Sequence, residues 1–171
     1  ISSGLVGSEM CIRDREDVPD LAFEKARIIY NFGADFLETW GRPVENARRL
    51  SESNAFDGKT KTELVHLSPH VSLTGAKADR WVVINPGSEA MVALSIASVI
   101  RDQKGGYDFL SGMLAAFAPE KVAEATGVPA KKMKELAQKF IENSPGLALG
   151  GGPSSRNSNL TSLHVAINIL N

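Results

Sequence analysis

The sequence predicts an α/β domain of the layered, Rossmann-like kind with a mainly parallel sheet. Short apolar runs rich in β-branched residues, such as residues 26–32 and 63–67, alternate with longer stretches whose apolar residues recur at helical spacing. Glycine and proline mark most boundaries between these segments. Strands that alternate with helices are typical of a parallel sheet, because each parallel connection needs a crossover that a helix can provide.

The first strand is expected over residues 26–32, because ARIIYNF is β-branched and aromatic and then meets Gly33. The loop GADFLETWGRP follows it. Pro43 opens a helix over VENARRLSESN, since proline suits the first helical position, where its missing N–H is not needed. A turn at residues 56–59 then leads into the second strand at residues 63–67.

Residues 62–100 organise the rest of the predicted domain. They contain the second strand, a crossing segment, a short strand within WVVIN, a tight Pro86-Gly87 turn and an amphipathic helix. We expect Ser88 to cap that helix and Glu89 to lie in its first turn. A helix start of this kind presents unpaired backbone N–H groups and the positive end of the helix dipole.

The remaining elements are mostly helices separated by glycine or proline. The helix AKKMKELAQKFIENS has apolar residues at helical spacing, which predicts one buried face. A short buried strand, LAL, then runs into a glycine run. In chain order we expect a break at Gly105-Gly106, a helix at 107–117, helices opened by Pro119 and Pro129, a strand at 147–149 and a last helix at 159–170.

The composition excludes several classes of protein. Of the 171 residues, 43% are hydrophobic and 23% are charged, as in an ordinary globular protein, and the formal net charge of -1 gives no general attraction to nucleic acid or anionic membranes. No apolar run approaches the ~20 residues that a bilayer-spanning helix needs. The single cysteine, Cys11, excludes an internal disulfide framework and a Cys-rich metal or iron–sulfur site within this chain.

Both ends of the chain affect the expected domain boundaries. The opening SSGLVGSEMCIRDR resembles a translated sequencing adapter, so we expect residues 1–15 to be an artefactual or disordered leader. Residues 16–171 form the predicted α/β domain. The helical apolar pattern of residues 163–170 is still running at Asn171, which favours an internal piece of a longer protein.

Candidate binding residues follow the predicted strands. In open parallel sheets, ligands bind beyond the carboxyl ends of the strands, so loops that follow different strands can meet at one edge. Four such strand ends carry polar or glycine residues. They are Gly33, Asp35 and Glu38; Ser68 and His70; Gly87, Ser88 and Glu89; and Gly150, Gly151 and Gly152.

Each strand end has a functional and a purely structural interpretation. The glycine run 150–152 lets a phosphate or pterin approach the backbone closely, or it forms a plain strand-to-helix turn. Glu89 can accept two hydrogen bonds from a guanine edge, or it is a favourable charge in a first helical turn. Asp35 and Glu38 are either ribose or phosphate-linked contacts or solvated loop carboxylates.

The histidines point to no metal site. His70 follows a strand and is a candidate for contacting a ligand phosphate or tuning a redox group. His66 is expected to be a hydrogen-bonded sheet residue, and His164 lies within the last helix. None of the three has metal-ligand spacing with another histidine, cysteine or carboxylate, and no nucleophile–base pair is recognisable.

The remaining residues and motifs establish no further binding site. Trp81 is expected to pack in or near the core, and Arg156 and Asn157 either bind an anion or face solvent. No Lys-Ser/Thr pair follows the glycine run, so a nucleoside-triphosphate loop is excluded, and G-x-G-x-x-G is absent.

Taken in order over residues 17–171, these segments resemble the molybdopterin oxidoreductase superfamily of the dimethyl-sulfoxide-reductase type. The resemblance lies in FGADFLET after one strand, LSPHVSLTGAKADRW after the next, VVINPGSEAMVALSIASVI, ATGVPAKKMKELAQKF and LALGGGPSSRNSN. Within the family, ADFLETW and SLTGAKADRW are most similar to subunits of quinone-linked respiratory complexes that have an iron–sulfur module.

The resemblance implies one of two α/β domains that hold a bis(molybdopterin guanine dinucleotide) cofactor. The metal-ligating residue of the family lies upstream of the resembling region, so no catalytic residue or metal ligand is assigned here. The roles implied are a nucleotide-facing loop for Gly33, Asp35 and Glu38, a ribose-reading turn for Ser68 and His70, a guanine pocket for Gly87, Ser88 and Glu89, and the pterin or phosphate side for Gly150, Gly151 and Gly152.

The same resemblance implies the surroundings of the protein. It suggests iron–sulfur and membrane quinone-reactive partner subunits, with any iron–sulfur cluster outside this chain. It also suggests association with the periplasmic face of a membrane without a direct membrane span. Neither the resemblance nor the charge implies a nucleic-acid partner.

Three departures from the family pattern keep a second interpretation open. Ser68 stands where an acid reads the ribose, His70 where an arginine is common, and Asp35 where asparagine is frequent. These changes favour a cofactor-free structural subunit of a respiratory complex as the alternative. The central domain of a thiamine-diphosphate enzyme is a more distant alternative, and a nicotinamide dehydrogenase is disfavoured because its glycine fingerprint is missing.

Overall fold

A four-stranded parallel sheet forms the centre of the structure, a computed structural model that describes residues 21–54, 61–105, 110–151 and 160–171. The strand order is β3-β2-β1-β4, and every neighbouring pair is parallel. The predicted α/β class with a parallel sheet is therefore confirmed. The strands are β1 (Ile28–Phe32), β2 (Glu63–Leu67), β3 (Arg80–Val82) and β4 (Gly146–Gly150).

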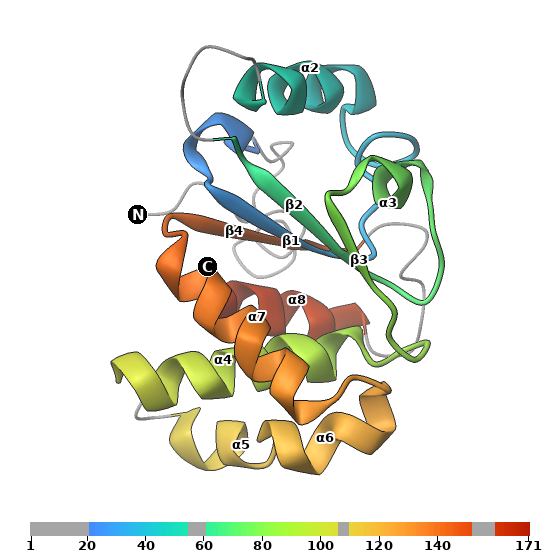
Figure 1. Ribbon diagram of the computed structural model, residues 1–171. Coiled ribbons are helices and arrows are strands. Elements are labelled where there is room, and N and C mark those ends of the chain that lie inside the picture. The colour runs from blue at the N-terminus through green and yellow to red at the C-terminus, as the bar shows by residue number, and fades with distance from the viewer. Residues whose placement is uncertain (1–20, 55–60, 106–109, 152–159) are drawn as a thin grey trace.

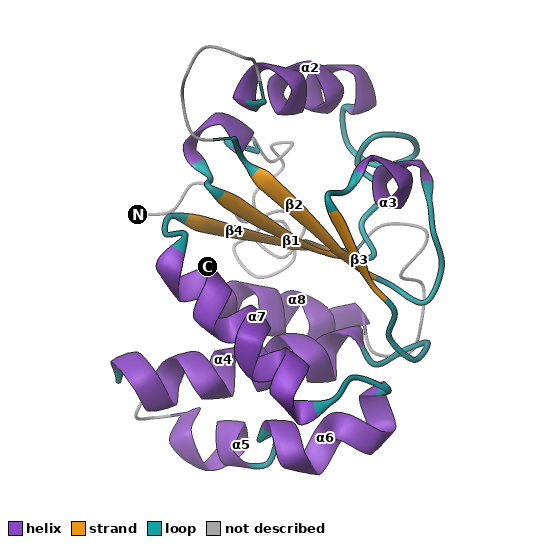
Figure 2. Cartoon of the chain, in the orientation of Figure 1, coloured by secondary structure: helices purple, strands orange, loops and turns teal. Residues whose placement is uncertain are grey.

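Helices cover both faces of this sheet (Figures 1 and 2). On one face lie α2 and the short helix η1, with α3 beside β3; on the other lie α7, α8 and α4, with α5 and α6 outside α4 (Figure 1). The bounds are η1 (Phe23–Lys25), α2 (Pro43–Ser53), α3 (Leu73–Lys77), α4 (Glu89–Lys104), α5 (Ser111–Ala115), α6 (Pro119–Thr126), α7 (Ala130–Glu142) and α8 (Leu160–Leu170).

Proline and glycine set the helix ends much as the sequence predicts. Pro43 and Pro119 are the first residues of α2 and α6, and Pro129 is the residue before α7. Gly127 ends α6 in the left-handed conformation, at φ 72°, which glycine adopts without a steric penalty.

The central strand β1 is buried on both faces, and its side chains divide between two apolar clusters. Ile28, Tyr30 and Phe32 pack with residues of α4, α7 and α8, whereas Ile29 packs with η1 and α2. Tyr30 donates a hydrogen bond to the carbonyl of Leu136 at 2.7 Å, which ties β1 to α7. Burial raises the pKa of Tyr30 well above its ordinary value.

Helix α4 is more deeply buried than the predicted amphipathic helix. Its buried residues run from Glu89 to Val99 and lie on all sides of the helix, because α7 and α8 pack against one side and α5 and α6 cover another. The predicted amphipathic character is therefore wrong for residues 89–99 of this helix. Small residues such as Ala93, Ser95 and Ala97 allow this close packing.

Two other expectations near β3 are corrected. The crossing segment before β3 contains α3, a helix of only five residues, which is too short to show a helical pattern in the sequence. Ser72, the residue before this helix, caps it: its hydroxyl accepts a hydrogen bond from the Gly75 N–H at 3.2 Å. Trp81 is 45% exposed and not buried, because β3 is an edge strand with only one neighbour. Its indole N–H donates to the carbonyl of Ser68 at 3.0 Å.

Some predictions fall outside the described residues. They concern the leader at 1–15, the turn at 56–59, the start of the helix at 107–117, and Gly152, Arg156 and Asn157. Among the helices that the structure does describe, none combines the length and apolarity that crossing a bilayer would require.

Candidate functional site

The strand order creates a topological switch point between β1 and β4. From β1 the chain passes through α2 on one face to β2, whereas β4 lies on the other side of β1 and is followed by α8 on the opposite face (Figure 1). In parallel sheets, ligands bind in the crevice that such diverging connections leave at the carboxyl ends of the strands. Gly33 follows β1 and Gly151 follows β4, so both flank this position.

The loop after β1 is closed by a side chain from within the strand. The Asn31 amide donates to the carbonyl of Ala34 at 2.7 Å, and its oxygen accepts from the Ala34 N–H at 2.8 Å. Gly33 sits between them at φ 73°, a conformation that a Cβ would strain. The backbone therefore turns sharply at the tip of β1.

Asp35 and Glu38, both predicted to face a nucleotide, lie in different environments. Asp35 is buried, and its carboxylate accepts hydrogen bonds from Thr74 at 2.9 Å and Thr39 at 3.4 Å. Glu38 is exposed. Asp35 thus organises the loop from within, while Glu38 remains accessible.

The β2 tip is built partly from Ser68. This residue is 1% exposed, and its N–H donates to the carbonyl of Val82 at 3.2 Å while its hydroxyl accepts from the His70 N–H at 3.4 Å. His70 itself is exposed. Of the two residues predicted to read a ribose, only His70 projects from the surface.

A tight turn precedes α4, as predicted. The Ser88 N–H donates to the carbonyl of Asn85 at 3.1 Å, and Gly87 has φ 78°, the third-position conformation of a type II turn with proline second. Ser88 occupies the N-cap position of α4 as predicted, but its hydroxyl makes no capping bond to the helix and instead donates to the Asn85 carbonyl at 2.6 Å. Glu89 is 5% exposed in the first turn.

The glycines at the β4 tip accommodate α8. A Cβ at Gly150 would lie 2.1 Å from Ile167, and a Cβ at Gly151, where φ is 102°, would lie 2.6 Å from Cε1 of His164. Close packing of helix on strand is therefore one reason for glycine here. His164 adjoins the switch point, which its position in a predicted helix does not indicate, because no pattern within a single helix shows which strand tip a side chain will meet.

A buried polar cluster lies behind the β1 and β2 tips. Nδ1 of His66 is 3.0 Å from the Asn31 amide nitrogen, while Nε2 is buried without a hydrogen-bond partner among the described residues. The predicted hydrogen-bonded sheet histidine is thus confirmed at one nitrogen only. Burial lowers the pKa of His66, and Asp35 opposes this effect.

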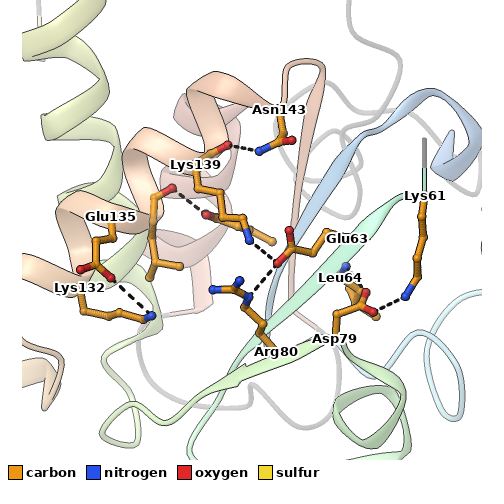
Figure 3. A network of polar contacts seen from close by, with 11 residues as sticks. Lys61, Glu63, Leu64, Asp79, Arg80, Lys132, Glu135, Lys139 and Asn143 are labelled. Atoms are coloured by element: carbon orange, nitrogen blue, oxygen red, sulfur yellow. Dashed lines mark hydrogen bonds and ion pairs between the residues drawn. The ribbon is translucent and has the colours of Figure 1, made fainter.

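A second charged feature lies away from the strand tips (Figure 3). Glu63, the first residue of β2, pairs with Arg80 at 3.0 Å and with Lys139 of α7 at 2.5 Å. A groove of about 800 Å³ with mixed charge adjoins it, lined by Arg80, Gln103, Lys131, Lys134, Glu135, Gln138, Lys139 and Glu142. Since Glu63 begins its strand, these charges mark the end of the sheet opposite the candidate site.

Within the described ranges, no group of three or more His, Cys, Asp or Glu side chains is placed to hold a metal ion. The residues gathered at the carboxyl edge are instead glycines, buried carboxylates and two histidines. Together with the sheet order, they define a parallel α/β domain with a topological switch point between β1 and β4, the place where such domains bind ligands.

Comparison with known proteins identifies the class of its relatives. Over 154 residues the chain is 29% identical to the menaquinone reductase molybdopterin-binding-like subunit of Nitratidesulfovibrio vulgaris, covering 86% of this chain and 22% of that protein. Over 86 residues it is 29% identical to the molybdopterin-containing subunit of arsenate respiratory reductase from Shewanella sp. strain ANA-3, covering 44% of this chain and 8% of that protein. No protein-family model matches the chain.

The fold also has a counterpart among solved structures. Acetylene hydratase from Pelobacter acetylenicus matches with a TM-score of 0.68 at 20% identity, over 86% of this chain and 21% of that one. The resemblance to molybdopterin oxidoreductase subunits that the motifs predicted is confirmed by the sequence relatives. The chain spans less than a quarter of the length of these relatives.

Proposed function

We propose that this domain binds a guanine dinucleotide arm of a bis(molybdopterin guanine dinucleotide) cofactor at the carboxyl edge of its sheet. The observation that carries the proposal is the β1–β4 switch point flanked by Gly33 and Gly151. The relatives support the ligand class, because two of them are named as molybdopterin-binding-like and molybdopterin-containing subunits.

The residues at this edge fit a ligand that carries both phosphate and guanine. Gly33 and Gly87 both have positive φ and no Cβ, and Gly87 is half-buried, so a ligand can approach the backbone at the turn before α4. The first turn of α4 carries the positive end of a 16-residue helix, and the Ser88 side chain does not cap it. Glu89 lies in the same turn, where a carboxylate matches the two adjacent N–H donors of a guanine.

In this assignment the chain binds and orients, and it supplies no reacting group. When bound, a molybdopterin cofactor would provide redox chemistry, which belongs to the cofactor and its metal. The residues of this chain would hold the nucleotide end of the cofactor. The guanine dinucleotide form of the cofactor and a role in respiratory electron transfer are both parts of this proposal.

The wider setting is proposed from the relatives. We infer a place in a membrane-associated respiratory oxidoreductase at the periplasmic face, with iron–sulfur and quinone-reactive partner subunits. The support is the first relative, which is named as a subunit of a menaquinone reductase. The chain itself would then be a domain of a larger cofactor-binding subunit.

A cofactor-free structural subunit is the second candidate, and a specific observation favours it. Both oxygens of the Asp35 carboxylate accept hydrogen bonds from threonines of the protein, and Ser68 is buried in the β2 tip. Two of the positions predicted to contact a nucleotide are thus engaged internally. A structural subunit would keep the loops in place for packing alone.

Calorimetric titration of the chain with guanosine diphosphate separates the two candidates. The proposed function predicts saturable binding, weakened about tenfold or more by Glu89→Gln, because a charge-assisted pair to guanine is lost. Glu63→Gln, at the other end of the sheet, is the matched control and should leave the affinity unchanged. Absence of binding, together with absence of pterin and metal in the anaerobically purified full-length protein, would favour the structural subunit.

A further inference from the structure

His164 lies against the backbone at the tip of β4. A Cβ built at Gly151 would be 2.6 Å from Cε1 and 3.1 Å from Nε2 of His164, so the Cε1–Nε2 edge of the imidazole faces the glycine. His164 belongs to α8, and Gly151 follows the last residue of β4. The ring therefore stands at one wall of the switch point between β1 and β4.

Packing alone does not explain a histidine at position 164, because its imidazole buries a nitrogen that has no hydrogen bond within the described part of the chain and so lowers the stability of the fold. The ring is half-buried, and its Nδ1 is buried with no hydrogen-bond partner among the residues that the structure describes. The neighbouring helix positions Leu163, Ala166 and Ile167 are buried and apolar, and an apolar side chain at position 164 would avoid an unpaired polar atom.

The neutral ring has one arrangement that reduces this cost. Burial lowers the pKa of His164, so at neutral pH one nitrogen carries a proton and the other a lone pair. If the proton is on Nε2, Nδ1 keeps only a lone pair, and no N–H donor is left buried and unpaired. The Nε2–H then needs an acceptor beside Gly151.

We propose that His164 is a ligand-contacting residue, whose Nε2–H donates a hydrogen bond to a phosphate oxygen of the nucleotide at the β4 tip. The proposal rests on the proposed function, since the ligand is the guanine dinucleotide inferred above. A phosphate suits this donor because its oxygens are strong acceptors, and glycine at position 151 lets the His164 ring lie close to the backbone at the strand tip.

The test compares guanosine diphosphate with guanosine, which lacks the phosphates. In calorimetric titrations, His164→Phe should weaken the binding of guanosine diphosphate about tenfold and leave that of guanosine unchanged, because one charge-assisted hydrogen bond is lost. His164→Asn keeps a donor and should lose less. Glu63→Gln is the control for both ligands, and circular dichroism melting verifies that each variant is folded.

A second measurement needs no substitution. In ¹H–¹⁵N long-range NMR spectra of the unmodified chain, saturating guanosine diphosphate should shift the His164 Nε2 signal and raise the pKa of the ring, since a phosphate anion favours the imidazolium. Unmoved His164 signals, or equal affinity of His164→Phe and the unmodified chain for guanosine diphosphate, would overturn the assignment of His164 alone. A chain that binds neither guanosine nor guanosine diphosphate overturns the proposed function as well.

Discussion

The carboxylate of Asp35 accepts a hydrogen bond from the hydroxyl of Thr74 at 2.9 Å, and the same hydroxyl accepts one from the Leu37 N–H at 3.2 Å. Asp35 belongs to the loop after β1, and Thr74 to α3, which follows β2. The two strand ends are thus joined by buried polar contacts, so the geometry of one tip depends on the other.

Replacing Thr74 by valine should break this junction. The substitution keeps the shape of the side chain but removes the donor to a buried carboxylate, which costs about 1.5–3 kcal/mol for a hydrogen bond to a charged group. Urea denaturation measures the loss in free energy of unfolding. Thr161→Val, at an exposed position of α8, is the control and should change it by less than about 0.5 kcal/mol. Equal stability of the two variants would contradict the role of Thr74.

Gly75 and Gly112 provide a matched pair of helical glycines. A Cβ at Gly75 would lie 2.7 Å from Cδ2 of the buried His66 ring, whereas a Cβ at Gly112 would have nothing within 4 Å. Gly75→Ala should therefore destabilise the protein by about 1–3 kcal/mol, because overpacking displaces the ring. Gly112→Ala should be neutral or stabilise it by up to about 1 kcal/mol through helix propensity. Thermal melting of both variants gives the comparison, and a higher melting temperature for Gly75→Ala would be inconsistent with this packing.

The turn before α4 requires a positive φ at Gly87. Valine in the left-handed region is strained, so Gly87→Val should cost about 1–3 kcal/mol and disturb the helix start. Asparagine tolerates this region better, and Gly87→Asn should lose clearly less stability. Chemical denaturation of the two variants tests the turn; an equal loss in both would indicate that the side-chain volume, and not the dihedral angle, is responsible.

The stability of the protein should fall in mild acid because of two histidines. Burial lowers the pKa of both His66 and His164 below the ordinary value of 6.5. The unfolded chain then binds protons at a higher pH than the folded one. The free energy of unfolding therefore has its full value above about pH 6.5 and decreases as the pH falls towards the pKa values of the folded protein.

Groups near His66 modify this effect, because a backbone hydrogen bond at His70 and the charge of Asp35 raise its pKa, while the charge of His70 lowers it. Urea denaturation between pH 8 and pH 5 measures the slope. His66→Gln should flatten the slope, whatever its effect on stability at pH 8. An unchanged slope would mean that His66 does not titrate differently in the two states.

The sequence predicts those features of the fold that depend on the backbone preferences of neighbouring residues. Proline at the first position of α2 and α6, and the Pro86-Gly87 turn, follow from dihedral angles and a missing N–H. β2 was predicted at its observed bounds, since an apolar run between polar segments needs little context. By contrast, α3 was missed, because five residues are too few to show a helical pattern.

The candidate site was predicted only in part. Glycines and carboxylates after each strand could be found from the alternation of strands and helices. The internal engagement of Asp35 by Thr74 joins residues 39 positions apart, and no local pattern indicates it. For the same reason, Trp81 was placed in the core although it lies on an edge strand, and His164 was not connected with Gly151.

By itself, the sequence determined the class of fold, the helix and turn boundaries set by proline and glycine, and the resemblance to molybdopterin oxidoreductase subunits. Only the tertiary structure decided the strand order, and with it the switch point between β1 and β4. The physical reason is that backbone preferences act between neighbours in the chain. The order of strands and the burial of charges depend instead on which distant surfaces pack together to exclude water.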